Sequence, residues 1–279
     1  IRVVARVRGE VTSLKLQGNA AYFAIKDAET ESVLNVFMWR SDVDLSGIEV
    51  REGVEVVVTG ASEIYKPYGR FSFRAQTIEL VGEGSLQAAY LALKKKLDEE
   101  GLFLPDRKRP LPELPERVGL ITSREGAVIH DFLNNLGRYG FSISFVDSRV
   151  EGVVAVKDLL AAMKRLAREP IDVLVLVRGG GSLESLQAFN NEHVVRAIAE
   201  FPVPVICAIG HDKDIPLAQL VADFAPSTPT ATTVLLNASW EEAITELSFL
   251  SRNLVSEFGA TLSDHARELE LSRGMLSLA

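Results

Sequence analysis

Hydrophobic and polar positions alternate in short runs over residues 1–84 of the chain. Runs such as RVVARVRGEV, AYFAIKDAE and RFSFRAQTIELV have the length and the β-branched and aromatic content of strands, and Gly, Asp, Pro and Ser residues separate them. Five runs of this kind in so short a segment predict a small closed barrel. By strand alternation, half of the aromatic side chains in these runs should point into the barrel core.

The period of the pattern changes in the segment 85–116. Apolar residues recur there at helical spacing, at Leu86, Tyr90, Leu93 and Leu97. Gly101 follows as a stop signal. The next stretch, PDRKRPLPELPERV, is rich in proline and basic residues and is typical of a linker. We therefore expect this segment to join the barrel to a second domain.

Residues 117–236 combine runs of Val, Ile and Leu with segments of helical periodicity. The runs VGLIT, SISFVDSRV, DVLVLV and PVICAIG are largely apolar, as in parallel strands that are buried on both faces. A helix-like segment follows each run, which predicts an α/β domain with a mainly parallel sheet. The segment after DVLVLV, ESLQAFNNEHVVRAIAEF, is predicted to be one helix. Right-handed crossovers would place the loops TSREG, RGGGS and GHDKD at one edge of this sheet, where they should meet at a single crevice.

Residues 237–279 are predicted to form an amphipathic helix, and APSTPTATT before it is predicted to be a rigid, hydroxyl-rich loop. Apolar residues recur there at spacings of three and four, at Trp240, Ile244, Leu247, Leu250, Leu254, Phe258 and Leu262. Such a helix either packs on the α/β domain or begins an extended arm. The predicted fold class is thus an α/β domain with an N-terminal all-β barrel, such as the OB-fold, and a C-terminal amphipathic helix.

Composition and charge narrow the range of partners. No apolar run approaches the roughly 20 residues that cross a bilayer, so no membrane partner is expected. The single cysteine, Cys207, lies in an apolar run, as expected for a core residue of a protein in the reducing cytoplasm. The net charge of −8 argues against a surface coated in positive charge for duplex DNA, but a local basic groove remains compatible with it.

The segment RGGGS follows the run VLVLV and precedes a helix-like segment. Glycines at this place let backbone N–H groups approach a phosphate, and a helix start adds partial positive charge. Arg178 adds a permanent planar cation. The spacing matches neither a Walker nucleotide motif nor a dinucleotide fingerprint. Alone, the motif fits a tight turn with a surface arginine equally well; the neighbouring loops favour the phosphate.

The loop GHDKD sets His211 close to Asp214 at another strand end. Histidine exchanges protons near neutral pH and a carboxylate fixes its tautomer, although Asp214 could equally act as a helix cap. In TSREGAVIHD, hydroxyl and N–H groups at a helix start either hold an anion or cap the helix. Asp131 follows in that helix, where an aspartate is commonly a partner of the helix dipole.

Together these loops offer backbone N–H groups, an arginine, a histidine and several aspartates. This set suits hydrolysis of a phosphodiester, because the cation and the N–H groups stabilise transition-state charge while the histidine transfers a proton. A barrel beside it would bind a single strand by stacking and backbone contacts. The residues expected to contact phosphate or DNA are Thr122, Ser123, Gly126, Gly179, Gly180, Gly181, Ser182, Asn190, Lys213, Thr228 and Thr230.

The ordered set of motifs resembles the exodeoxyribonuclease VII large-subunit family. The similarity runs from RGEVTSLK and VTGASEIYKPYGRFSF, through GEGSLQAAYLALKKKLDEEGLF and ERVGLITSREGAVIHD, to VRGGGSLESLQAFNNE, AIGHDKD and STPTATT. It covers nearly the whole chain. The resemblance implies an OB-fold, a central nuclease domain and a C-terminal helical region that recruits several small subunits. It also implies exonucleolytic hydrolysis of single-stranded DNA from either end, giving oligonucleotides and nucleoside 5′-phosphates.

The resemblance places the catalytic residues at Asp131, Arg178, His211 and Asp214. It implies no strict requirement for a divalent metal. A rival assignment makes Asp131, Asp212 and Asp214 ligands of Mg²⁺. GHDKD departs from the more usual GHETD of the family, and TPTATTVLL lacks the Glu that often follows TPTAAA in the family.

The expected partners are single-stranded DNA and exodeoxyribonuclease VII small subunits, with a homodimer of large subunits as a further arrangement. Two other functions fit the same scaffold: a catalytically inactive protein that binds single-stranded DNA, and a regulatory domain that binds a nucleotide. A cleavage assay separates the first from a nuclease, and competition between long single strands and mononucleotides tests the second.

Overall fold

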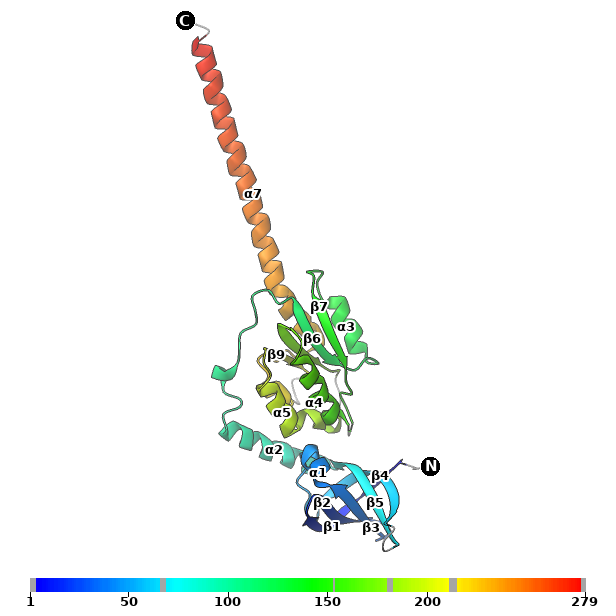
Figure 1. Ribbon diagram of the computed structural model, residues 1–279. Coiled ribbons are helices and arrows are strands. Elements are labelled where there is room, and N and C mark those ends of the chain that lie inside the picture. The colour runs from blue at the N-terminus through cyan, green and yellow to red at the C-terminus, as the bar shows by residue number, and fades with distance from the viewer. Residues whose placement is uncertain (1–3, 66–68, 153, 180–182, 211–214, 277–279) are drawn as a thin grey trace.

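The computed structural model describes residues 4–65, 69–152, 154–179, 183–210 and 215–276. It has three parts in chain order: a closed barrel, an α/β domain and a long helix that projects from this domain (Figure 1). The barrel and the far end of the helix lie at opposite ends of the molecule (Figure 1). None of the helices in the described part of the chain is both long and apolar enough to span a membrane.

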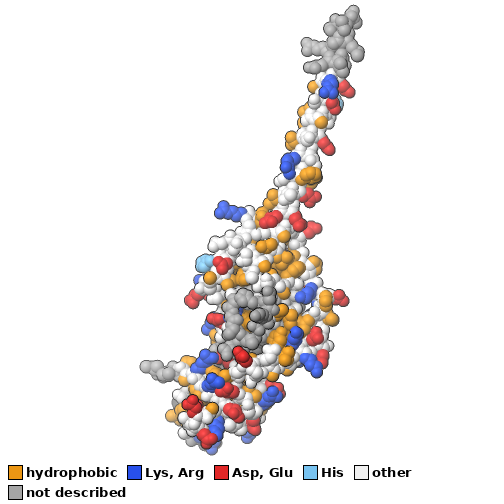
Figure 2. Space-filling model, turned by 180° about the vertical axis from the view of Figure 1, so that it is seen from behind, with side chains coloured by type: hydrophobic (Ala, Val, Ile, Leu, Met, Phe, Trp, Pro, Cys, Tyr) orange, Lys and Arg blue, Asp and Glu red, His pale blue; other side chains and the backbone are white. Residues whose placement is uncertain are grey.

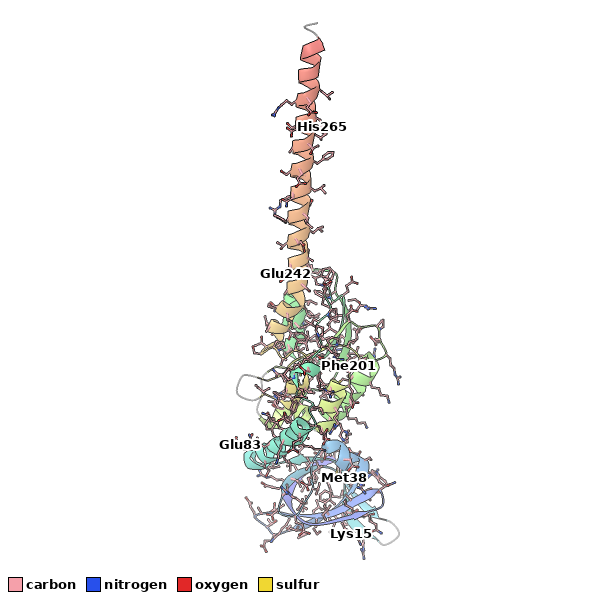
Figure 3. All side chains as sticks on the ribbon, turned by 90° about the vertical axis from the view of Figure 1, so that its left-hand side faces the viewer. Lys15, Met38, Glu83, Phe201, Glu242 and His265 are labelled. Atoms are coloured by element: carbon pink, nitrogen blue, oxygen red, sulfur yellow. The ribbon has the colours of Figure 1, made fainter. Side chains whose placement is uncertain are left out.

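The N-terminal barrel closes in the strand order β1-β2-β3-β5-β4, which confirms the predicted fold of this domain. A short helix, α1 (Arg40–Ser46), connects β3 to β4. The sequence pattern did not predict α1, because RSDVDLS is short and mostly polar. Met38 and Phe73 lie in the barrel core, and Figure 3 shows the first of them. The strands are β1 (Val4–Gln17), β2 (Ala20–Lys26), β3 (Val33–Trp39), β4 (Glu55–Tyr65) and β5 (Arg70–Leu80).

The segment between the domains begins with α2 (Glu83–Glu99), which confirms the predicted helix, and continues through η1 (Pro105–Arg107). Its basic stretch is tied to the α/β domain through Arg109. The Asp223 carboxylate accepts hydrogen bonds from the Arg109 backbone N–H at 2.7 Å and from its Nη2 at 2.7 Å. The linker is therefore fixed to the surface of the second domain.

The second domain holds a four-stranded sheet in the order β7-β6-β8-β9. Its strands are all parallel, which confirms the predicted sheet type. Side chains alternate between two apolar cores: Val173 and Val175 point to one face, Leu174 and Leu176 to the other. Cys207 is fully buried in β9, and this burial raises the pKa of its thiol, so it is a core residue. The strands are β6 (Arg117–Thr122), β7 (Ser142–Asp147), β8 (Val173–Val177) and β9 (Val205–Ala208).

Helices cover both faces of this sheet (Figure 1). On one face lie α3 (Ala127–Asn135) and the start of α7; on the other lie α4 (Ala155–Leu166), α5 (Glu192–Ala199) and α6 (Leu217–Val221). The segment ESLQAFNNEHVVRAIAEF was expected to be one helix, and this was wrong. It divides into η2 (Leu183–Asn190) and α5, because Asn191 has extended backbone and its side chain accepts the N–H of His193 as an N-cap.

The terminal helix α7 runs from Pro229 to Leu276. The stretch TPTATT was expected to be a loop, but it forms the first turns of this helix. Thr228 is the reason, because its Oγ1 accepts the N–H of Ala231 at 3.0 Å, and proline suits the first helical position. Trp240 anchors the helix by donating to the carbonyl of Pro115 at 3.0 Å and stacking on Tyr139. Beyond this anchor the helix leaves the domain, carrying exposed apolar side chains (Figure 2).

The Asp223 side chain is only 5% exposed, so its hydrogen bonds to the linker and to β9 should be important for stability. Burial opposes ionisation, but hydrogen bonds from Arg109 and from the Val205 N–H outweigh it and lower the pKa of the carboxyl. We expect Asp223→Asn to reduce the free energy of unfolding by about 3 kcal/mol at pH 7. Urea denaturation measures this, and Asp264→Asn, in an exposed ion pair on α7, should cost less than about 0.5 kcal/mol.

The pH dependence gives a second check on Asp223. Because its pKa is lower in the folded state, the stabilisation is fully present above the unfolded pKa and is lost as the pH falls through the folded value. The stability difference between wild type and Asp223→Asn should therefore shrink in acid. A difference that stays constant into acid would contradict the assignment.

Candidate functional site

The carboxyl edge of the parallel sheet contains a topological switch point between β6 and β8. From β6 the chain crosses to β7 on one side, and β8 continues to β9 on the other. Open α/β sheets bind ligands at such a point, outside the carboxyl ends of the strands. The loops that follow β6, β7, β8 and β9 all leave from this edge, as a parallel sheet requires, whereas most of the loops RGGGS and GHDKD lies outside the described residues.

Arg178 follows β8 directly at this edge. Its backbone N–H donates to the Ala208 carbonyl at 3.0 Å, which joins the ends of β8 and β9. Its side chain is only 4% exposed, yet Nη2 donates to Oε2 of Glu151 at 3.1 Å, and the Glu151 side chain is 68% exposed. Among the described residues, Arg178 Nη1 is buried and has no hydrogen-bond partner. A buried guanidinium group with an unsatisfied donor can donate a hydrogen bond to an anion that binds beside it.

The turn after β6 lies against the loop after β8. A Cβ atom placed on Gly179 would lie 3.4 Å from Cγ2 of Val128 in the first turn of α3. Gly126 is the N-cap of α3 and makes no side-chain cap hydrogen bond, so no capping side chain at this position satisfies the N–H groups of the first turn. Thr122 is buried, and Ser123 is half-buried with its carbonyl accepting the Gly126 N–H at 3.4 Å.

Asp131 lies on α3 and is exposed. The structure pairs Arg178 with Glu151 rather than with Asp131. Glu151 lies on the loop between β7 and α4, and sequence reasoning missed it, since no motif surrounds it. Asp147, at the end of β7, was missed as well; its Oδ1 accepts the N–H of Arg124 at 2.9 Å and so holds the turn after β6.

His211, Lys213 and Asp214 lie outside the described residues, as do Gly180, Gly181 and Ser182. The chain on both sides of residues 211–214 is held by side chains. The Gly210 N–H donates to Gln219 Oε1 at 3.2 Å, and the Leu217 N–H donates to Asn190 Oδ1 at 2.9 Å. The Ile215 carbonyl accepts the hydroxyl of Tyr90, on α2, at 3.0 Å. Asn190 thus has a structural contact that the sequence did not reveal.

The two remaining predicted contacts lie at the start of α7. Thr228 is exposed and caps the helix, and Thr230 is exposed with its carbonyl accepting Thr233 Oγ1 at 2.7 Å. Within the described ranges, no group of three or more His, Cys, Asp or Glu side chains is arranged to hold a metal ion. Two of the three carboxylates in the rival metal assignment, Asp212 and Asp214, lie outside those ranges.

A second surface of interest is an aromatic cluster on the outside of the barrel, formed by Tyr22, Phe37 and Trp39. The ring centroids of Tyr22 and Phe37 are 5.5 Å apart, and those of Phe37 and Trp39 are 5.0 Å apart. Tyr22 is 45% exposed and Trp39 43% exposed, whereas Phe23 and Phe73 are buried, as alternation predicted. Arg74 of β5 is the register partner of Phe37 of β3, and its guanidinium group forms an ion pair with Glu63 at 3.9 Å.

The barrel and the α/β domain are held together at the carboxyl end of α1. Asn191 Nδ2 donates to the carbonyls of Leu45 at 2.9 Å and Ser46 at 3.0 Å. A cavity of about 520 Å³ lies beside this contact, between α1, β5 and α2 on one side and the loop before α4 and η2 on the other. Gly152, the residue after Glu151, is one of the residues that line it.

Comparison with known proteins identifies the family. The protein-family model for the large subunit of exonuclease VII matches residues 102–277 of this chain. The family model for an OB-fold nucleic acid binding domain matches residues 2–79. The chain belongs to the exonuclease VII large-subunit family. Within this family it is 37% identical over 274 residues to the exodeoxyribonuclease 7 large subunit of Geobacter metallireducens, covering 96% of this chain and 60% of that protein.

Other members of the exonuclease VII large-subunit family give similar values. The exodeoxyribonuclease 7 large subunit of Desulfitobacterium hafniense is 36% identical, over 95% of this chain and 66% of its own length. That of Lactobacillus helveticus is 39% identical, over 81% of this chain and 51% of its own length. This chain spans about 60% of the length of the first curated relatives it matches.

Proposed function

We propose that this chain hydrolyses phosphodiester bonds of single-stranded DNA from strand ends, as the large subunit of a heteromeric exonuclease in the cytoplasm. The observation that carries the proposal is Arg178: a nearly buried guanidinium group with an unpaired Nη1, at the switch point of the sheet, in a chain of the exonuclease VII large-subunit family. Such a group supplies the fixed cation that a phosphoryl transition state requires.

In the proposed mechanism, Arg178 and the backbone N–H groups of Gly179 and its neighbours bind the scissile phosphate and stabilise the charge of its transition state. His211 activates the attacking water or protonates the leaving oxygen, and Asp214 orients the imidazole. Asp131 positions water or another group of the site. These three roles rest on the family resemblance, with no strict requirement for a divalent metal.

The barrel would hold the strand that enters the crevice. Exposed Tyr22 and Trp39 can stack on bases without sequence preference, and Arg74 can contact the backbone. The interdomain cavity, lined by Gly152 and by residues of β5, would be a place for the strand to pass between the barrel and the α/β domain. The exposed apolar residues of α7 would recruit small subunits, among them Leu247, Leu254 and Phe258.

The decisive experiment offers 5′-labelled dT30 and a 30-base-pair duplex to the chain, with and without small subunits and excess EDTA. We expect degradation of dT30 only, persistence of activity in EDTA, and quenching of Trp39 fluorescence on binding, measured in a Trp240→Phe variant. Binding without cleavage in every arm would favour a binding protein, and complete loss of activity in EDTA would favour the carboxylate–Mg²⁺ assignment.

A further inference from the structure

The ion pair between Arg178 and Glu151 joins a buried cation to an exposed anion. The Arg178 side chain is 4% exposed and the Glu151 side chain 68% exposed. Glu151 therefore lies on the solvent side of the guanidinium group, the side from which a phosphate would approach. Its carboxylate therefore occupies the position beside Arg178 that a substrate phosphate would take.

The carboxylate satisfies only part of the arginine. Glu151 Oε2 accepts from Nη2, whereas Nη1 is buried and lacks a partner among the described residues. A guanidinium group donates through two parallel N–H groups when it binds a phosphate, so a phosphate can satisfy both nitrogens. The exposed carboxylate regains its hydration when it moves away, which makes its displacement inexpensive.

From this geometry we infer that the Glu151 carboxylate occupies the place on Arg178 that the substrate phosphate takes. The phosphate displaces this carboxylate when DNA binds. The inference rests on the proposed function of the same site. Glu151 thus lowers the affinity of the crevice for phosphate while keeping the buried cation partly neutralised in the absence of DNA. It is a residue that sets affinity and does not take part in the chemical step.

The test uses Glu151→Gln, which retains the shape of the side chain and removes its charge. Affinity is measured by fluorescence anisotropy with fluorescein-labelled dT30 whose phosphorothioate linkages resist hydrolysis. We expect the dissociation constant to fall about fivefold to tenfold, because a repelling charge leaves the phosphate site. With ordinary dT30, KM should fall by a similar factor while kcat stays unchanged.

Two controls separate this effect from a general change of charge. Glu169→Gln removes the same charge from an ion pair with Arg165. This pair lies just before β8, at the edge of the sheet opposite to Arg178. The affinity of this variant for dT30 should stay within about twofold of the wild-type value. In an Arg178→Met background, Glu151→Gln should no longer tighten binding, since the two changes act through one contact.

If Glu151→Gln binds dT30 with unchanged affinity, the inference is wrong. If it binds dT30 more weakly, the inference is also wrong, and Glu151 instead holds Arg178 in its binding position. This failure is distinguishable from failure of the proposed function. If Arg178→Met leaves cleavage intact, the function assigned to the crevice is wrong. If Arg178→Met abolishes cleavage while Glu151→Gln binds like wild type, only the role of Glu151 is wrong.

Discussion

Arg178→Met is expected to lower the hydrolysis of single-stranded DNA by roughly 1,000-fold without lowering the stability of the chain. The loss follows from removing the cation that faces the transition-state charge. Stability should hold because the buried charge is matched only by an exposed carboxylate, and Nη1 lacks a partner among the described residues. Replacing such a charge by an apolar side chain of similar volume is often neutral or stabilising.

Turnover of dT30 and the midpoint of thermal unfolding should be measured on the same preparations. Arg178→Lys keeps the charge but loses the planar pair of donors, so it should retain more activity than methionine and less than wild type. Arg165→Met, in an exposed pair with Glu169, should leave turnover unchanged within about twofold. If Arg178→Met lost activity only in proportion to a lower unfolding midpoint, its role would be structural.

His211→Ala is expected to lower cleavage of dT30 by about 100-fold to 10,000-fold while binding of the strand stays within about twofold of wild type. The proposed role of this residue is proton transfer, which contributes to the chemical step and not to holding the strand. The flanking Gly210 and Ile215 are held by Gln219 and Tyr90, so the loop ends should keep their positions in the variant.

The control for this histidine is His265→Ala. His265 is exposed on α7, far from both domains (Figure 3). It should cleave dT30 at the wild-type rate. Retention of cleavage by His211→Ala would remove His211 from the mechanism, and loss of binding in parallel with cleavage would assign it to strand recognition instead.

The main architecture of the chain could be predicted because its signals are local. The runs VLVLV and VICA have apolar residues at every position, and their strands are fully buried in the parallel sheet. Alternation predicted that half of the aromatic side chains face the barrel core, and the structure buries Phe23 and Phe73 and leaves Trp39 exposed. The placement of the loops at one edge of the sheet could be predicted from the handedness of the crossovers alone, because this rule does not depend on individual contacts.

The features that were missed depend on contacts between distant residues. Asn191 interrupts a helical pattern because its side chain caps α5. The same side chain donates a hydrogen bond to Ser46 at the end of α1, 145 residues earlier in the chain. The partner of Arg178 could not be anticipated for the same reason, because Glu151 is 27 residues away on a loop without a motif. The start of α7 at Pro229 was hidden by the loop-like composition of TPTATT.

Anything bound to the outer part of α7 lies far from the crevice. From Trp240 to Leu276 the helix extends by roughly 54 Å, at about 1.5 Å per residue. A small protein held only there would lie away from the proposed site at Arg178. In the proposed function it would instead gather several chains, so that a strand released by one of them is recaptured by its neighbour before it diffuses away. Processivity, more than the rate of bond cleavage, is the property that such clustering would govern.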